Sequence, residues 1–365
     1  MNDREYYLWL NEQKGIGIRT IHRLLEYFDS PKAVYEASER ELNRLKEHFQ
    51  IKQSQIATLL SQRNPADIKK RSAMLNEAGI SYVTIHDAKY PGRLKEIYEP
   101  PLILYYKGTL PKEDRVSVSI VGARNCSNYG RVVAESISAG LADCGIQIIS
   151  GMARGIDTYA HRGALRAHGN TYAVLGCGVD ICYPTENIGL YMDIQKQGCV
   201  LSEFLPGTQG SPGTFPMRNR IISGLSDGVL IIEAKKKSGS LITAKWALEQ
   251  GKDVFAVPGS ILGEESRGCN NLIKEGAMLV DSKEDILTYY GITDRKDLTA
   301  KKPNNLLDSK EEMVYSNVCL IPRHVDQIAK DSGYSAVETM RILVKLESLH
   351  IIKRTGMQYF SVIVE

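Results

Sequence analysis

The chain has 365 residues, which corresponds to two or three domains at roughly 150 residues per domain. Its composition, 43% hydrophobic and 24% charged, is that of a globular protein and excludes a disordered chain or a collagen-like fibre. A net charge of +3 excludes a histone-like basic coat, so a polyanionic partner has to be bound by a local site. Because no apolar run approaches about 18 residues and the N-terminus lacks an apolar signal segment, we expect a cytoplasmic chain without a membrane span.

Residues 1–62 are predicted to form a small helical domain. Apolar side chains recur at helical spacing from Tyr7 to Leu10 and again from Ile18 to Phe28. The turn between them, residues 14–20, places Gly15 and Gly17 around one apolar residue. That pattern fits a tight turn inside a helical bundle, and it also fits the phosphate-binding hairpin of a module that resembles SAM or helix-hairpin-helix domains.

Residues 63–290 are predicted to form the main domain, which belongs to the α/β class. After a helical stretch and two strand-like segments, short apolar runs alternate with amphipathic helical patterns. Such alternation is typical of a doubly wound, mostly parallel, Rossmann-like sheet with helices on both faces. The expected strands are residues 80–85, 102–106, 116–121, 146–149, 172–175, 200–202, 229–232, 254–257 and 277–280, and the expected helices between the later ones include residues 130–141, 158–168, 188–197 and 241–250.

The C-terminal part is predicted to be a linker, residues 291–308, followed by a winged helix, residues 309–365. Three helical segments (309–317, 323–331 and 335–349) precede a hairpin that turns near Gly356. This domain carries seven basic and seven acidic residues, a balance that argues against strong duplex binding. Contact with DNA and contact with a partner protein both remain open for it.

Loops rich in glycine follow nearly every strand of the main domain. In a doubly wound sheet, ligands bind outside the carboxyl ends of the strands, where glycines and helix N-termini expose N–H groups to anions. Several such loops along one edge indicate a ligand with several phosphates. Residues 235–237 are three lysines next to one of these loops, and they fit either a solvated surface or a phosphate contact. Hydroxyl and guanidinium donors in the loops are Ser127, Ser150, Ser238, Ser240, Thr243, Arg124, Arg218 and Arg220.

Sequence signatures of catalysis and of cofactors are missing. The chain has no G-x-x-x-x-G-K-[ST] motif, and the turn at Gly176 lacks the third glycine of a dinucleotide fingerprint. The G-x-S-x-G match at residues 224–228 follows a helical pattern and precedes a strand, the reverse of a nucleophile elbow. The seven cysteines are scattered without metal-ligand spacing. We therefore expect no cofactor, no metal and no catalytic residue.

Three acidic residues near strand ends are the remaining candidates for acid–base chemistry. They are Asp157, Glu203 and Glu233. The structural alternative is that Asp157 caps the helix after Gly155 and that each glutamate pairs with a nearby arginine.

Several segments of the main domain together resemble the DNA-processing protein A family, also called DprA or Smf. They are residues 150–157 (SGMARGID), 215–225 (FPMRNRIISGL) and 238–244 (SGSLITA), with Gly122-Ala123-Arg124, Ser127, Tyr129-Gly130 and Val257-Pro258-Gly259. The resemblance covers about residues 117–281, and the two outer domains fit the family's three-part layout.

The resemblance implies a bacterial cytoplasmic protein of natural transformation. It would bind incoming single-stranded DNA, protect it from nucleases and load the recombinase RecA onto it, as a homodimer and without making or breaking bonds. The residues that it assigns to the DNA pocket are Gly122, Arg124, Ser127, Ser150, Gly151, Met152, Ala153, Gly155, Arg218, Asn219, Arg220, Ser238, Gly239 and Thr243. Phe215 is either a base-stacking platform or a core residue. The surface for self-association or RecA would lie around Leu248, Asn270, Ile273 and Leu279.

Two other functions remain as alternatives. Nucleotide phosphoribohydrolases of the lysine-decarboxylase-like class share a Rossmann-like fold, but residues 212–214 lack the further glycines and the glutamate of their P-G-G-x-G-T-x-x-E motif. A nucleotide-sensing winged-helix regulator would instead bind duplex DNA with sequence specificity.

Overall fold

The computed structural model describes residues 1–13, 15–49, 51–292, 308–318, 323–349, 352–356 and 358–362. The chain divides into two compact units, Met1–Ile292 and Thr293–Glu365, and each has its own hydrophobic core. The first unit spans the expected domain boundary between residues 62 and 63, and one of its hydrophobic cores contains residues from both sides of that boundary. The division of residues 1–62 from residues 63–290 stays a prediction. The expected linker lies outside the described residues except at positions 291, 292 and 308.

The first unit begins with a run of helices. Side-chain oxygens of Asn2, Ser30 and Asn64 accept backbone N–H groups at the starts of three of them, as N-caps do. In the turn after the first helix, Gly15 has a positive φ of 78°, and its carbonyl accepts a hydrogen bond from Gln55. The helices are α1 (Asp3–Asn11), α2 (Ile18–Phe28), α3 (Pro31–Glu36), α4 (Glu39–Phe49), α5 (Gln53–Ser61) and α6 (Pro65–Glu77).

A nine-stranded sheet forms the centre of the first unit, in the order β1-β2-β6-β5-β4-β3-β7-β8-β9. In the part of the sheet that runs from β6 to β9 in this order, each strand is parallel to its neighbours. At the other end of the sheet, β1 pairs with β2 and β2 pairs with β6 in antiparallel orientation. The inner strands are buried along their length, as expected of strands covered on both faces. The strands are β1 (Ser81–Thr84), β2 (Ile103–Gly108), β3 (Ser117–Gly122), β4 (Gln147–Ser150), β5 (Thr171–Val174), β6 (Gly198–Ser202), β7 (Gly228–Ile232), β8 (Asp253–Ala256) and β9 (Met278–Leu279).

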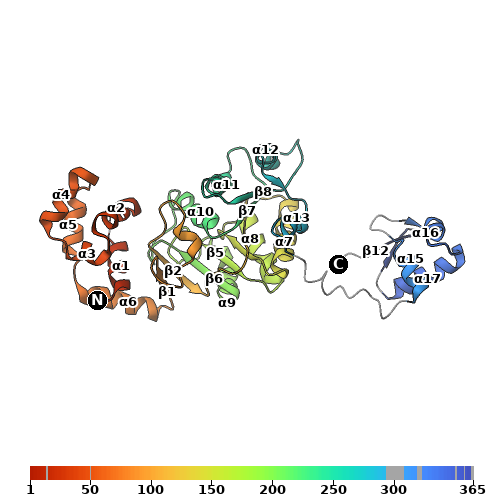
Figure 1. Cartoon of the computed structure of the whole chain (residues 1–365), viewed down its shortest axis with the longest axis horizontal. Coiled ribbons are helices and arrows are strands. Elements are labelled where there is room, and N and C mark those ends of the chain that lie inside the picture. The colour runs from red at the N-terminus through yellow and green to blue at the C-terminus, as the bar shows by residue number, and fades with distance from the viewer. Residues whose placement is uncertain are drawn as a thin grey trace. The chain divides into compact units, whose positions relative to one another are not determined.

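Helices cover both faces of this sheet (Figure 1). One core joins α7, α8 and α13 to the sheet, and a second joins α10, α11 and α12 to it. The fold is thus the Rossmann-like, mostly parallel α/β sheet that the sequence predicts. The helices are α7 (Asn128–Asp143), α8 (Ile156–Arg166), α9 (Ile188–Gln197), α10 (Thr214–Gly224), α11 (Ser240–Glu249), α12 (Arg267–Lys274) and α13 (Lys283–Tyr289), with the short 3-10 helices η1 (Gly92–Lys95), η2 (Thr185–Asn187) and η3 (Glu264–Ser266).

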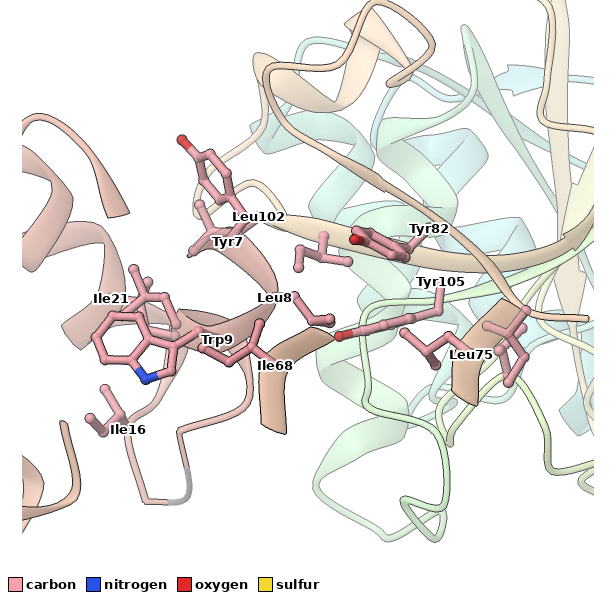
Figure 2. Close-up of a cluster of buried hydrophobic side chains, with 14 of the residues drawn as sticks. Tyr7, Leu8, Trp9, Ile16, Ile21, Ile68, Leu75, Tyr82, Leu102 and Tyr105 are labelled. Atoms are coloured by element: carbon pink, nitrogen blue, oxygen red, sulfur yellow. The ribbon is translucent and has the colours of Figure 1, made fainter. Parts of the chain in front are cut away.

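The N-terminal helices and the sheet share one apolar core. Leu8 and Trp9 of α1 are fully buried in a cluster that also contains Tyr82 and Tyr105 from β1 and β2. Figure 2 shows Leu8 directed toward Tyr105, with Ile68 and Leu75 of α6 beside it. Burial of this apolar surface attaches the helical region to the antiparallel edge of the sheet.

The second unit is a winged helix. A three-stranded sheet in the order β10-β12-β11 packs with three helices around Leu343, Leu346 and Phe360. The side chain of Ser335 accepts the Glu338 N–H and caps the third helix, as the sequence predicts. The elements are α15 (Ser309–Tyr315), β10 (Arg323–His324), α16 (Val325–Ser332), α17 (Ala336–Ser348), β11 (Ile352–Gly356) and β12 (Tyr359–Val362).

Within the part of the chain that the structure describes, no helix has both the length and the apolar character needed to cross a bilayer.

Replacement of Leu8 by alanine tests the shared core. Removing a fully buried leucine should lower the free energy of unfolding of the first unit by about 2–5 kcal/mol. Urea unfolding followed by tryptophan fluorescence measures this unit alone, because both tryptophans, Trp9 and Trp246, belong to it.

The matched control is Leu343→Ala in the second unit, which should leave that fluorescence transition in place. A Leu8→Ala variant made in a Trp9→Phe background reports on the sheet through Trp246. If that transition did not move, the helices and the sheet would unfold independently.

Candidate nucleic-acid interface

The candidate site lies where the strand order of the sheet reverses. Chain connections run from β3 to β4 on one side and reach β7 on the other, so the loops that follow β3 and β7 lead away from each other, although the strands themselves stay paired up to Gly122 and Ile232. Such a switch point is where doubly wound folds bind ligands. A pocket of about 710 Å³ opens at this position, and the loops after β3, β4, β5 and β7 contribute to its wall.

Nine of the predicted site residues line this pocket. They come from segments that are far apart in the sequence, and the fold brings them together. They are Gly122, Arg124, Ala153, Phe215, Arg218, Asn219, Ser238, Gly239 and Thr243.

Six other predicted residues, Gly155 among them, are absent from the lining of this pocket. The Ser127 hydroxyl donates to Glu233, and the Ser150 hydroxyl donates to the Ile120 carbonyl over 2.6 Å. Gly151 contacts Arg218 and Asp157 through its backbone, and buried Met152 has a positive φ of 61°. Arg220 is buried against Glu203. Direct contact between these side chains and a ligand stays a prediction.

Two glycines allow the β3 and β4 loops to approach each other and the neighbouring strand. Gly155 has a φ of 75°, and a Cβ atom there would lie 2.2 Å from the carbonyl oxygen of Ala123. At Gly122, a Cβ would lie 1.8 Å from the Ile232 carbonyl oxygen. Any side chain at these positions would separate the loops, so the geometry of the pocket requires glycine here.

A buried guanidinium ties together the ends of two strands. Arg218 of α10 is 4% exposed, and its Nη1 donates over 2.7 Å to the Gly151 carbonyl after β4 and also to the Val174 carbonyl at the end of β5. Burial lowers the pKa of Arg218 to about 10, which the nearby Asp157 carboxylate partly offsets. The side chain therefore remains charged at neutral pH while it fixes the pocket floor.

Asp157 is the acidic counterpart of this arginine. Its Oδ2 accepts the N–H groups of Gly151 and Ala153 over 3.1 and 3.3 Å. The carboxylate thus holds the preceding loop, whereas the N-cap of α8 is Gly155. Burial raises the pKa of Asp157 to about 6, against the lowering effects of Arg218 and the two N–H groups.

An exposed cation and two aromatic rings form one side of the pocket. The Cζ of Arg124 lies 5.5 Å from the ring centroid of Phe215, and the Phe215 ring lies 5.3 Å from that of Tyr183 with an interplanar angle of 31°. Phe215 is thus partly exposed to the pocket, and Tyr183 is 49% exposed. Among the described residues, no carboxylate lies within 4.0 Å of the Arg124 guanidinium.

Tyr183 was not among the predicted site residues. It follows β5 in the loop that begins with the glycine turn at Gly176 and Gly178, and its place in that loop was the signal that the sequence offered. Two of the three lysines at 235–237 also line the pocket: Lys235, which pairs with Glu265 over 3.0 Å, and Lys237. The cationic lining residues are Arg124, Arg218, Lys235 and Lys237, against the acidic residues Asp157 and Glu265.

The two glutamates considered for acid–base chemistry have structural partners. Glu203 forms an ion pair with Arg220, as the structural alternative anticipates. Glu233 differs from that expectation: it accepts the backbone N–H of Ser127 over 2.8 Å and the Ser127 hydroxyl, at the start of α7. The described residues contain no group of three or more His, Cys, Asp or Glu side chains able to hold a metal ion.

The residues predicted for self-association lie on or near β9, which is the edge strand opposite β1 in the sheet of the first unit. Leu248 of α11 is 64% exposed and Leu279 of β9 is 43% exposed. Ile273 packs partly into a core, and the Asn270 amide exchanges two hydrogen bonds with the backbone of Gly259. The two leucines are therefore the exposed apolar members of this set.

The family model and several curated relatives give the same family. The model of the family "DNA recombination-mediator protein A" matches residues 81–291. The DNA processing protein DprA of Streptococcus pneumoniae is 45% identical over 242 residues, covering 64% of this chain and 86% of that protein. The Bacillus subtilis protein of that name is 44% identical over 216 residues, covering 59% of this chain and 72% of its own length.

Two solved structures share the fold. That of DNA processing protein A from S. pneumoniae has a TM-score of 0.62 at 39% identity, over 79% of this chain and 98% of that chain. That of DNA processing protein A from Helicobacter pylori, which binds single-stranded DNA, has a TM-score of 0.52 at 30% identity, over 57% of this chain and 95% of that chain.

The stability of the first unit should depend on pH through Asp157. Because the pKa of Asp157 is raised from 3.8 to about 6, its protonated form contributes stability that is complete below about 3.8 and is lost as pH rises through about 6. Asp157→Asn should remove about 1–3 kcal/mol of this pH dependence. Urea unfolding of both proteins across that range measures it, and parallel curves would contradict the assignment.

Proposed function

Since this chain belongs to the DNA recombination-mediator protein A family, we propose that it binds single-stranded DNA in the pocket at the switch point of its sheet. The observation that carries the proposal is the arrangement of Arg124, Phe215 and Tyr183: a guanidinium with no carboxylate partner among the described residues, beside two neighbouring aromatic rings. Proteins that bind single strands combine cations along the backbone with aromatic platforms for the bases. In a duplex the base faces are already stacked, so these rings favour an unpaired strand.

The phosphates of the strand are proposed to contact the cationic side of the pocket. Arg124 supplies forked donors, and Lys237 and the loop at residues 238–240 supply further N–H and hydroxyl groups beside it. Contacts to phosphates and base faces carry little sequence information, so we expect binding that tolerates any base sequence.

We propose that the protein acts by binding alone, without making or breaking bonds. Three acidic groups near the pocket support this: Asp157 holds loop N–H groups, Glu203 pairs with Arg220, and Glu233 holds Ser127. Each carboxylate has a structural role that a general acid or base would have to give up.

In the cell, the proposed role is that of a cytoplasmic recombination mediator in natural transformation. The bound strand is protected from nucleases and passed to RecA, and the protein acts as a homodimer. The exposed Leu248 and Leu279 support a contact surface at the β9 edge, because exposed leucines near an edge strand are suited to burial by a partner. The winged helix, with balanced charge, is proposed to assist rather than to dominate DNA binding.

Titration of labelled oligonucleotides at two salt concentrations tests the proposed function. The full chain should bind single strands more tightly than duplexes. Arg124→Ala should weaken single-strand binding about 10- to 100-fold, because a charge-assisted phosphate contact is lost. The slope of log affinity against log salt should also become shallower by about 0.7.

The matched control is Arg115→Ala. Arg115 is an exposed arginine just before β3, at the amino edge of the sheet and thus opposite the pocket. This variant removes the same charge and should retain full affinity. Equal losses in both variants would indicate a general charge effect and contradict a local site.

Substitutions of Tyr183 separate stacking from hydrogen bonding. Tyr183→Ala removes a ring and should weaken single-strand binding about 10-fold, since a stacked base contributes about 1–3 kcal/mol. Tyr183→Phe keeps the ring and should bind as tightly as the unmodified chain. Fluorescence anisotropy of a labelled oligonucleotide measures both, and a loss in the phenylalanine variant equal to that in the alanine variant would rule out stacking.

A further inference from the structure

A second cluster of cations and an aromatic ring lies outside the pocket, on helices α7 and α8. The Cζ atoms of Arg131 and Arg162 lie 5.9 and 5.6 Å from the ring centroid of Tyr159. Both arginines are exposed and the tyrosine is half-buried, with part of its ring packed on the core below. We call these three residues the Arg–Tyr–Arg surface.

The two guanidinium groups of this surface are not neutralised. Among the described residues, neither has a carboxylate within 4.0 Å, and Arg131 donates to the amide oxygen of Asn128 over 2.9 Å. Neighbouring arginines differ: Arg154 pairs with Glu186 through two bonds of 2.7 Å, and Arg166 lies 3.6 Å from Glu135. Arg131 and Arg162 therefore keep their charge and most of their donors for a ligand.

The Arg–Tyr–Arg surface lies close to pocket residues along the chain. Helix α7 begins three residues after the pocket residue Asn125, and α8 begins three residues after the pocket residue Ala153. Arg131 and Tyr159 lie in the first turns of these helices, and Arg162 lies about 9 Å along α8 from its start. The Ile156 N–H donates to the Ala123 carbonyl and fixes the two helix starts side by side at the rim.

We infer that the Arg–Tyr–Arg surface binds the nucleotides that continue out of the pocket. The inference rests on the proposed function and adds a second subsite to it. Phosphates of the strand bind the two guanidinium groups, and a base stacks on the plane of the tyrosine or of an arginine, both of which are known stacking partners of unpaired bases. Two guanidinium groups beside an aromatic ring fit a nucleic acid, which offers both phosphates and base faces. They fit an acidic protein surface less well, because such a surface has no base to stack on the ring.

We assign a single strand to the Arg–Tyr–Arg surface because this surface lies near the pocket. A strand that lies on the pocket rim at Asn125 and Ala153 meets Arg131 and Tyr159 within about one helical turn. The close packing of α7 on α8, where a Cβ at Gly163 would lie 2.4 Å from the Glu135 carbonyl oxygen, fixes the spacing of the two arginines. The path from pocket to surface is therefore rigid.

Oligonucleotides of two lengths test this inference. A thymidine oligomer of about 2 nucleotides fits within the pocket alone, whereas one of about 20 nucleotides also reaches the second subsite. The double variant Arg131→Gln, Arg162→Gln should bind the long oligomer about 10-fold more weakly and the short one unchanged. Its salt slope for the long oligomer should fall by about 0.7 for each arginine removed.

Substitutions of Tyr159 provide an independent measurement on the same surface. Tyr159→Ala should weaken binding of the long oligomer about 10-fold, and Tyr159→Phe, which keeps the ring and its packing, should not. Arg115→Gln at the amino edge of the sheet is the control for charge, and circular dichroism checks the fold of each variant.

Each outcome decides between the alternatives. Loss confined to the long oligomer supports the second subsite. Unchanged binding of the long oligomer overturns it, as does an equal loss for both lengths, which would give these residues a role in the pocket or the fold. If the unmodified chain bound neither oligomer, the proposed function itself would fail, which is a result distinct from failure of the subsite alone.

Discussion

The pocket depends on one buried positive charge. Arg218 reaches from α10 to the carbonyl groups that end β4 and β5, and its charge is balanced within the fold by Asp157, which holds the N–H groups of the same loop. A guanidinium in this position is stable only when nearby acceptors replace the water it has lost. The same contacts fix the pocket floor before any ligand arrives, so little ordering is left for the binding step.

Arginines of the first unit therefore have two different roles. Arg218 is buried and positions the backbone, and Arg220 is buried in an ion pair with Glu203. The other three, Arg124, Arg131 and Arg162, are exposed and lack a carboxylate partner among the described residues. The exposed arginines lie beside aromatic rings. Arg124 lies beside Phe215 in the pocket, and Arg131 and Arg162 lie beside Tyr159 on helices α7 and α8. A small net charge is thus compatible with a polyanionic ligand, because the ligand is proposed to bind at a local group of cations.

The glycines and the sheet topology make this concentration possible. Gly122 and Gly155 let the β3 and β4 loops approach within contact distance, and the reversal of strand order turns the loops after β3 and β7 away from each other. The N-terminal helices, which are joined to the opposite edge by the core around Leu8 and Tyr105, leave this opening free. Scaffold and site are therefore built from separate parts of the first unit.

The sequence by itself determined the α/β class, the positions of the strands and the glycine loops, because the period of apolar residues and the steric freedom of glycine are local properties. It also supplied the motifs of the family. Only the tertiary structure decided which side chains meet: that Arg218 is buried while Arg124 is exposed, that the Tyr183 ring lies beside Phe215, and that Arg131 of α7 lies beside Tyr159 of α8. These contacts join residues that are distant in the chain, so they depend on how helices pack on the sheet, and no local pattern encodes that packing.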